Sequence, residues 1–164
     1  MTVTANSAGP DTSGADDTLD DITDALLTAS RLLVAISARS IAQVEESLTV
    51  AQFRVLVILS TRGTSNLAGL AGQLDVQPST IGRMVERLVA TGLLVREPHP
   101  HSRRELVISL SARGHDVVDA VTRRRRQEIA RVVAAIPARD RRGLVTALTA
   151  FSAAGGEPPA HSEL

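Results

Sequence analysis

The chain has 164 residues and an apolar fraction of 43%, enough to bury the core of one ordinary domain and short for two independent ones. It contains no cysteine, which excludes a disulfide scaffold, a cysteine-ligated zinc site and a thiol-based redox switch. The formal net charge is zero, but residues 1–24 hold six Asp and no base, so the remaining residues, with 18 Arg and 12 acids, carry a charge of +6 that is compatible with a DNA partner.

The two ends of the chain differ in composition from its middle. Residues 1–17 have no apolar periodicity and predict a disordered acidic leader, and residues 154–164 predict a flexible tail. There is no basic segment followed by an apolar one near the start, and no uninterrupted apolar run approaches 18 residues. We therefore expect a cytoplasmic protein with no membrane partner.

A long amphipathic helix is predicted from Leu19 to Val44, where apolar side chains recur at steps of three and four. A second apolar row, Leu27, Val34 and Ile41, lies at intervals of seven. The helix is therefore apolar over more than one stripe. We expect it to pack against two partners, one of which could be a second copy of the chain.

Three shorter helices follow, each with a recognisable start. Thr49 and Gln52 form a capping box, which predicts a helix over 50–61 that ends at Arg62-Gly63. Asn66 is a suitable cap for a helix over 67–74, and Pro78 suits the first turn of a helix over 78–90.

The second half of the chain predicts a hairpin and two helices. The β-prone runs 93–97 and 105–109 flank a polar loop, 98–104, that is too long for a two-residue turn. A long helix is expected from about 112 to 136, where Pro137 stops it, and a final helix over 139–153.

The segment 66–90 has the form of a helix-turn-helix, in which a short helix and a tight turn precede a second helix. The N-terminal residues of such a second helix face base edges in the major groove of DNA. In this chain they are Gln77, Pro78, Ser79, Thr80, Gly82 and Arg83. Hydroxyl groups suit phosphates or bases, and Arg can address guanine with two parallel hydrogen bonds. The apolar positions Ile81, Met84, Val85 and Leu88 are expected to face the core.

Some of these residues also have simpler interpretations. Gly82 weakens a helix by about 1 kcal/mol relative to Ala, which a close approach of DNA would explain and genomic drift would explain equally well. Arg103 and Arg104, near the end of the hairpin loop, fit a wing that lies along DNA, where a narrow minor groove attracts Arg. An Arg pair on a surface loop is more often simply solvated; the order of the elements favours the functional interpretation.

The ordered set of motifs resembles the MarR family of transcription regulators. The similarity is carried by Leu48-Thr-x-x-Gln52, Leu67-Ala-x-Leu-Ala71, Pro78-Ser-Thr-x-x-Arg83-x-x-x-Arg87-Leu88, Gly92-Leu-Leu, Arg96 with Arg103-Arg104, and Val107-x-Leu-Ser-x-x-Gly114. It spans residues 18–153. It implies a mainly α fold, a winged helix-turn-helix with long N- and C-terminal dimerisation helices and a short β-hairpin wing.

The resemblance also implies an organisation and partners. Residues 48–114 would form the DNA-binding lobe, and residues 18–46 and 115–153 the helices that pair two chains into a homodimer. A ligand pocket would lie between the dimer helices and the DNA-binding lobe. Independently of the resemblance, we expect Arg87 and Arg96 to contact phosphates or other groups of the protein. The family often has Asp in the wing, where this chain has His99, His101 and Ser102, and often has Gly in the turn, where Asp75 would adopt a positive φ.

Other side chains offer little chemistry. His99 and His101 make a poor metal site without a nearby Cys or matched acid, although their protonation near pH 6 could strengthen DNA binding. The run Arg123–Arg126 sweeps the whole circumference of its helix, so at least one Arg must point inward or toward a neighbour, where it could pair with an acid, approach DNA or bind an anionic ligand. No phosphate loop, nucleophile elbow or Ser/His/Asp set at motif spacing is present, so we expect no enzyme and no cofactor.

The leading hypothesis is a sequence-specific transcription regulator, a ligand-responsive repressor that binds double-stranded DNA as a homodimer on a near-palindromic operator. The alternative is a helical dimerisation module whose winged helix does not read DNA and binds protein partners. The class of any small-molecule effector stays open, because the chain lacks the Tyr and Trp that often line such pockets.

Overall fold

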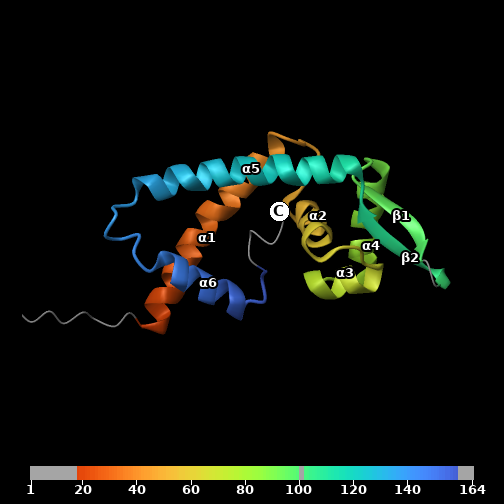
Figure 1. Ribbon diagram of the computed structural model, residues 1–164. Coiled ribbons are helices and arrows are strands. Elements are labelled where there is room, and N and C mark those ends of the chain that lie inside the picture. The colour runs from red at the N-terminus through yellow and green to blue at the C-terminus, as the bar shows by residue number, and fades with distance from the viewer. Residues whose placement is uncertain (1–17, 100–101, 159–164) are drawn as a thin grey trace, which may run out of the picture. The chain divides into compact units, whose positions relative to one another are not determined.

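A computed structural model describes residues 18–99 and 102–158 of the chain, so the predicted leader 1–17 lies outside the described residues. The fold is mainly helical with one antiparallel hairpin, as the sequence predicts. Its elements in chain order are α1 (Leu19–Ala42), α2 (Val50–Arg62), α3 (Leu67–Leu74), α4 (Pro78–Ala90), β1 (Leu94–His99), β2 (Ser102–Leu110), α5 (Ala112–Ala135) and α6 (Leu144–Ala154) (Figure 1).

The chain divides into two compact units, 1–32 and 33–164, and α1 begins in the first. Helix α1 begins directly after Thr18, and the Thr18 Oγ1 atom accepts a hydrogen bond from the Asp21 backbone N–H at 3.1 Å. The Thr18 backbone N–H and hydroxyl both donate to Asp21 Oδ2, at 3.1 and 2.6 Å. These hydrogen bonds lower the pKa of Asp21, and they satisfy N–H groups that a helix start leaves unpaired.

α1 is long and apolar enough to cross a membrane, although charged residues interrupt it. A single helix of this kind is weak evidence for a membrane span, since core helices of soluble proteins and signal sequences share its length and apolar composition. Its apolar side chains Leu27 and Val34 are about half exposed, at 54% and 57%.

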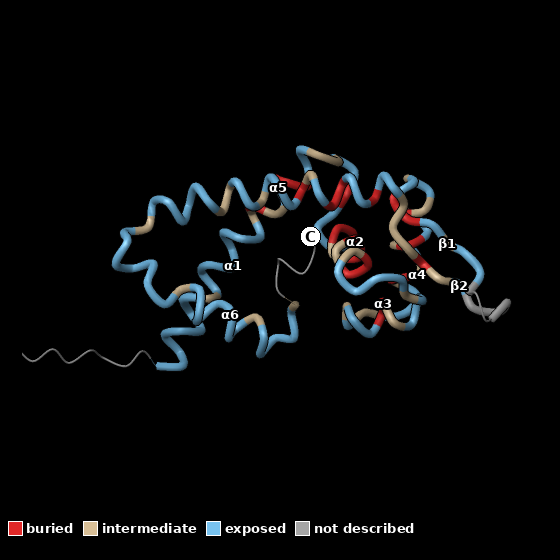
Figure 2. Tube along the Cα trace, viewed as in Figure 1, coloured by how far each residue is buried: buried red, intermediate tan, exposed pale blue. Residues whose placement is uncertain are grey.

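The core lies in the second unit and is built around α2. Phe53, Val55, Leu56 and Leu59 of α2 are almost fully buried, and they belong to one cluster with apolar residues of α3, α4, α5 and the hairpin. Buried residues accumulate in α2, α4 and the N-terminal half of α5, whereas α6 has none (Figure 2). The capping box at Thr49 and Gln52 is present, with hydrogen bonds of 3.0 and 3.2 Å, and sets the start of α2.

The hairpin extends further than the sequence suggests. β1 and β2 pair from Leu94 with Leu110 to Pro98 with Leu106, and after a register shift His99 pairs with Ser102. Residues expected in a long loop, Arg103 and Arg104 among them, therefore belong to β2. Backbone pairing does not require an apolar pattern, so an exposed two-stranded ribbon can continue through polar residues. Pro98 lacks an N–H group and lies beside the irregularity, as expected for proline in a strand.

The final helix also differs from the prediction. It begins at Leu144 rather than at 139, because Gly143 adopts a left-handed conformation with φ 80° that an α-helix cannot contain. Asp140 and Arg141 instead donate their backbone N–H groups to the Pro137 carbonyl oxygen in a turn. The predicted end of α5 at Pro137 is confirmed, since the last helical residue is Ala135.

Candidate nucleic-acid interface

The turn between α3 and α4 sets the direction of α4. Asn66 caps α3 by accepting the Gly69 N–H at 2.8 Å, and Asp75 ends it with φ 51° and ψ 48°. Asp75 is the only residue other than glycine with positive φ among the described residues, which confirms the expectation for this position. Its backbone N–H lies within bonding distance of the Ala71 and Gly72 carbonyl oxygens, so the chain reverses sharply after α3.

The first turn of α4 presents polar side chains to solvent. Pro78 stands at the first helical position, and the Gln77 side chain makes no capping hydrogen bond. Gln77, Pro78 and Ser79 are exposed and Thr80 is half-buried. Pro78 has no backbone N–H, and the Thr80 and Ile81 N–H groups donate to the Gln77 carbonyl oxygen at 2.9 and 3.2 Å. The helix start is therefore suited to anions such as phosphate mainly through its exposed polar side chains and the positive end of the helix dipole.

The buried face of α4 determines which residues point outward. Ile81, Val85 and Leu88 are at most 1% exposed, and Met84 packs against the same core, as the spacing predicts. Arg83 and Arg87 lie on the opposite side and are exposed. Within the described part of the chain, neither forms an ion pair or a side-chain hydrogen bond. Both guanidinium groups are therefore available to a partner outside the chain.

Packing against the described part of the chain does not require a glycine at position 82. A Cβ atom at this position would meet no atom within 4 Å, and the residue lies beside exposed Arg83. The helix therefore accepts a residue of poor helical propensity at a site where Ala would fit.

The wing is joined to the start of the helix-turn-helix by a contact that the sequence did not predict. Ser65 forms an isolated β-bridge with Ile108, with backbone hydrogen bonds of 3.1 and 2.8 Å. The sequence offers only a weak signal for this contact: two residues, Thr64 and Ser65, separate Gly63 from the cap Asn66, which is too short for a strand of ordinary length. The side chains of Arg103, Arg104 and His99 and the whole of His101 lie outside the described residues. The proposed wing contacts and the histidine hypotheses stay predictions.

A second unpredicted contact joins the end of α4 and the start of α5 to the segment that follows α1. The Arg113 guanidinium donates to the Thr91 carbonyl oxygen and to the Glu45 carboxylate. Thr91 ends α4 and Glu45 follows α1, so one side chain at the start of α5 joins three segments. Nothing in the local sequence pairs Arg113 with an acid 68 residues away.

The comparisons with known proteins agree with this geometry. The family model of the MarR family matches residues 48–106, from just before α2 into β2. RV1404 from Mycobacterium tuberculosis, a crystal structure, is 62% identical, with a TM-score of 0.83 over 90% of this chain and 100% of that chain. The chain belongs to the MarR family.

Two further proteins are similar to this MarR-family chain at lower sequence identity. An HTH-type transcriptional regulator of Mycobacterium leprae is 32% identical over 84 residues, which cover 51% of this chain and 58% of that relative. The chain thus aligns with less than two thirds of the length of this relative. BpsR of Bordetella bronchiseptica, whose DNA binding is regulated by 6-hydroxynicotinic acid, is 26% identical with a TM-score of 0.60, over 80% of this chain and 98% of that chain. The relatives and the fold are those of transcription regulators and not of enzymes, as the sequence predicts.

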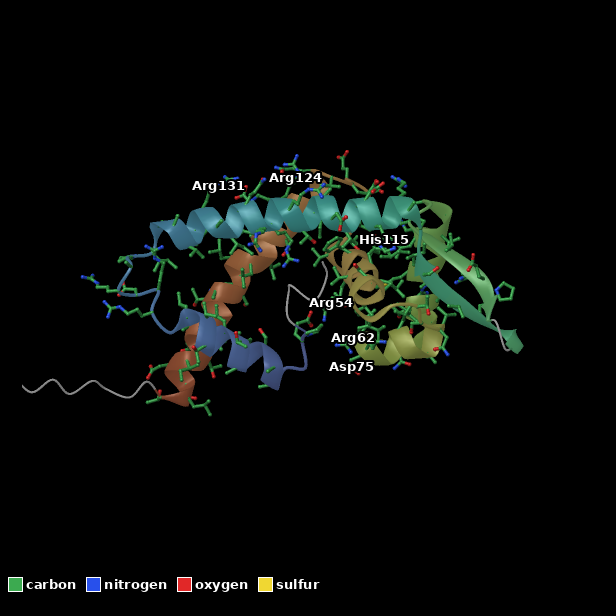
Figure 3. The ribbon with its side chains drawn as sticks, in the orientation of Figure 1. Arg54, Arg62, Asp75, His115, Arg124 and Arg131 are labelled. Carbon is green, nitrogen blue, oxygen red and sulfur yellow. The ribbon has the colours of Figure 1, made fainter. Side chains whose placement is uncertain are left out.

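The second unit of this MarR-family chain also contains a cavity of about 740 Å³. It is lined by the C-terminal part of α1, by α2, α5 and α6, and by the residues after α6. Its walls are mainly apolar, with hydroxyl groups and three charged side chains: Arg54, Arg125 and Glu157 (Arg54 is labelled in Figure 3). The volume falls in the range of small-molecule sites, about 300–1,000 Å³.

Arg125 is the member of the Arg123–Arg126 run that points inward, as the helical geometry requires of at least one. Its side chain is half-buried, and its Nε atom is buried with no hydrogen-bond partner among residues 18–99 and 102–158. Burial, and secondly the charge of nearby Arg54, lower its pKa. Its neighbour Arg124 donates instead to Gln43 Oε1 at 2.8 Å, so the run divides between the surface and the cavity.

Proposed function

We propose that this MarR-family chain is a sequence-specific transcription regulator that binds double-stranded DNA. The observation that carries the proposal is the exposed polar face of α4, whose Arg83 and Arg87 have no partner within the described residues. Residues at the start of α4 would read base edges in the major groove: Gln77, Pro78, Ser79, Thr80, Gly82 and Arg83. Arg87 would hold a phosphate, and Arg103 and Arg104 would extend along the backbone or the minor groove.

The regulator would act as a homodimer. In the single chain, α6 has no buried residue, and Val145, Leu148 and Phe151 are at least half exposed. Large apolar side chains of α1, among them Leu27 and Val34, are also exposed. Apolar surface of this extent on helices indicates a protein interface, and a second copy would cover it. Two recognition helices related by a two-fold axis would lie about 34 Å apart, which requires a near-palindromic operator.

The cavity supports a regulatory role for a small molecule. It adjoins α2, which carries the core of the DNA-binding lobe, so a ligand there could bias the position of that lobe. A ligand-responsive repressor in the cytoplasm is the simplest arrangement, and relief of repression would follow from ligand binding. The DNA binding of the relative BpsR is regulated by a small aromatic acid.

Fluorescence anisotropy on DNA from upstream of the gene, titrated with salt and compared with an unrelated duplex, tests this function. We expect binding at least about a hundredfold tighter than to the unrelated duplex, with a steep salt dependence, since specific binding exceeds non-specific binding by a large ratio. Equal and weak binding to both duplexes, and to a panel of genomic fragments, would contradict it. Sedimentation of the free protein checks the dimer separately.

A further inference from the structure

The charges in the cavity are unbalanced. Two guanidinium groups, those of Arg54 and Arg125, line it with one carboxylate, that of Glu157. Glu157 pairs with Arg54, with hydrogen bonds from Nη1 and Nη2 at 2.8 and 2.5 Å. Among the residues that the structure describes, the charge of Arg125 therefore has no counter-charge, and it lies in a mainly apolar space where an isolated charge is unfavourable.

The carboxylate that pairs with Arg54 comes from the end of the chain. Residues 155–158 follow α6, within the segment predicted as a flexible tail, and they contact α2. Besides the pair with Glu157, Arg62 donates from Nη2 to the Gly156 carbonyl oxygen at 3.2 Å. Pro158 also lines the cavity. We call residues 155–158 the C-terminal strap.

The contacts of the strap are suited to release. The side chains of Arg54 and Glu157 are 41% and 44% exposed, and solvent screens pairs of this kind. The two parallel hydrogen bonds from Arg54 to the Glu157 carboxylate are a bidentate geometry that a guanidinium group can form equally with the carboxylate of a ligand. An incoming carboxylate or sulfonate could take the place of Glu157 and would also neutralise Arg125.

We propose that the C-terminal strap is an internal competitor in the cavity, and that an apolar organic monoanion binds beside Arg125 and displaces Glu157 from Arg54. The inference rests on the proposal that the cavity is the effector site. Apolar walls at Ile41, Phe53 and Val118 would hold the body of the ligand, and the two guanidinium groups its charge. The ligand affinity of the cavity would then depend on how firmly the C-terminal strap binds Arg54 as well as on the ligand itself.

Two fluorescent probes separate charge from apolar contact. Anilinonaphthalene sulfonate carries one negative charge, and phenylnaphthylamine has the same ring system without it. We expect Glu157→Gln to bind the sulfonate about fivefold more tightly than the wild type, since the strap loses a weak ion pair and the cavity a negative charge. Arg125→Gln is expected to bind it at least about tenfold more weakly, since it removes a charged partner of the anion.

The controls are the neutral probe and a matched acid. Phenylnaphthylamine affinity should stay the same in all variants, and Glu46→Gln, which neutralises an exposed acid with no ion pair in the described part of the chain, should bind the sulfonate as the wild type does. If Arg125→Gln melts early, Arg125→Lys keeps the charge and should lose less affinity. Equal sulfonate affinities in the wild type and Glu157→Gln would overturn the proposal that the C-terminal strap competes with the anion. An unchanged sulfonate affinity in Arg125→Gln would overturn the proposal that the anion binds beside Arg125.

Operator binding is measured on the same samples without probe. Normal DNA binding with no effect of either substitution on sulfonate binding would overturn this inference and leave the proposed function standing. The expected probe results with no specific DNA binding would support the inference and count against the proposed function.

Discussion

Gly114 lies so close to Leu93 that a Cβ atom on Gly114 would be 2.2 Å from the Leu93 carbonyl oxygen. The neighbouring Ser111 caps α5 by accepting the Gly114 N–H at 2.9 Å, donates its hydroxyl to Gly92 O at 2.6 Å, and donates its own N–H to Leu93 O at 3.1 Å. The start of α5 is thereby held against the turn between α4 and β1. Only glycine permits this approach, because the obstructing atom belongs to the backbone and cannot rotate away.

Gly114→Ala should lower the free energy of unfolding by about 1–3 kcal/mol, since either α5 or the α4–β1 turn must shift. Urea denaturation measures the change. Gly72→Ala is the matched control, because a Cβ at exposed Gly72 in α3 meets nothing within 4 Å. That control should raise the free energy of unfolding by about 0.5–1 kcal/mol through helix propensity. Equal effects of the two substitutions would mean that the close approach is not maintained in solution.

Asp75→Ala should destabilise the protein by about 1–2 kcal/mol, because Ala tolerates the left-handed conformation at the end of α3 less well than Asp or Gly. Asp75→Gly should leave the stability unchanged or raise it. Thermal unfolding of both variants tests the difference. If Ala and Gly proved equally stable at this position, the turn would not depend on a positive φ.

Gly82→Ala separates helix stability from DNA contact. Because no described residue has an atom within 4 Å of a Cβ there, the substitution should raise the free energy of unfolding by about 1 kcal/mol. If the backbone approaches DNA at Gly82, operator affinity should fall about tenfold, which corresponds to about 1.4 kcal/mol. A more stable variant with unchanged affinity would favour genomic drift as the origin of the glycine.

Arg83→Ala should weaken binding to the operator by about 1–3 kcal/mol and relax specificity at one base pair, as expected for a guanidinium group that contacts a base. Anisotropy with the operator and with single base-pair variants measures both effects. Arg142→Ala removes an exposed Arg in the turn before α6 and should bind as the wild type does. A uniform loss over all base-pair variants would assign Arg83 to a phosphate instead.

The hydrogen bonds from Arg54 hold the pKa of Glu157 below its ordinary value. A carboxyl group with a lowered pKa in the folded state stabilises that state above its unfolded pKa, and this contribution disappears as the pH falls through the folded value. The strap should therefore release under acid conditions, and Arg54→Gln should return the pKa of Glu157 to the ordinary range. Carbon NMR titration of the Glu157 carboxyl group tests both points. An identical titration in the wild type and the variant would show that the pair does not form in solution.

The sequence by itself determined the features that depend on neighbours a few residues apart. The capping box at Thr49, the cap at Asn66 and the proline start of α4 were predicted from the residue types, and the structure confirms them. The left-handed turn at Asp75 was expected from the family resemblance and is also confirmed. Each depends on backbone groups within about four residues, so the local residue types suffice. The apolar periodicity likewise identified the buried face of α4, and hence the exposed face that we propose for DNA binding.

Only the tertiary structure decided the contacts between distant segments. The Ser65 bridge to Ile108, the Arg113 contacts with Thr91 and Glu45, and the Arg54 pair with Glu157 join residues 22 to 103 positions apart. The sequence required one Arg of the Arg123–Arg126 run to point inward, but the packing of α5 selected Arg125 and placed it in the cavity. Such contacts depend on the relative position of whole helices, which arises from the burial of the shared core and leaves no pattern along the chain.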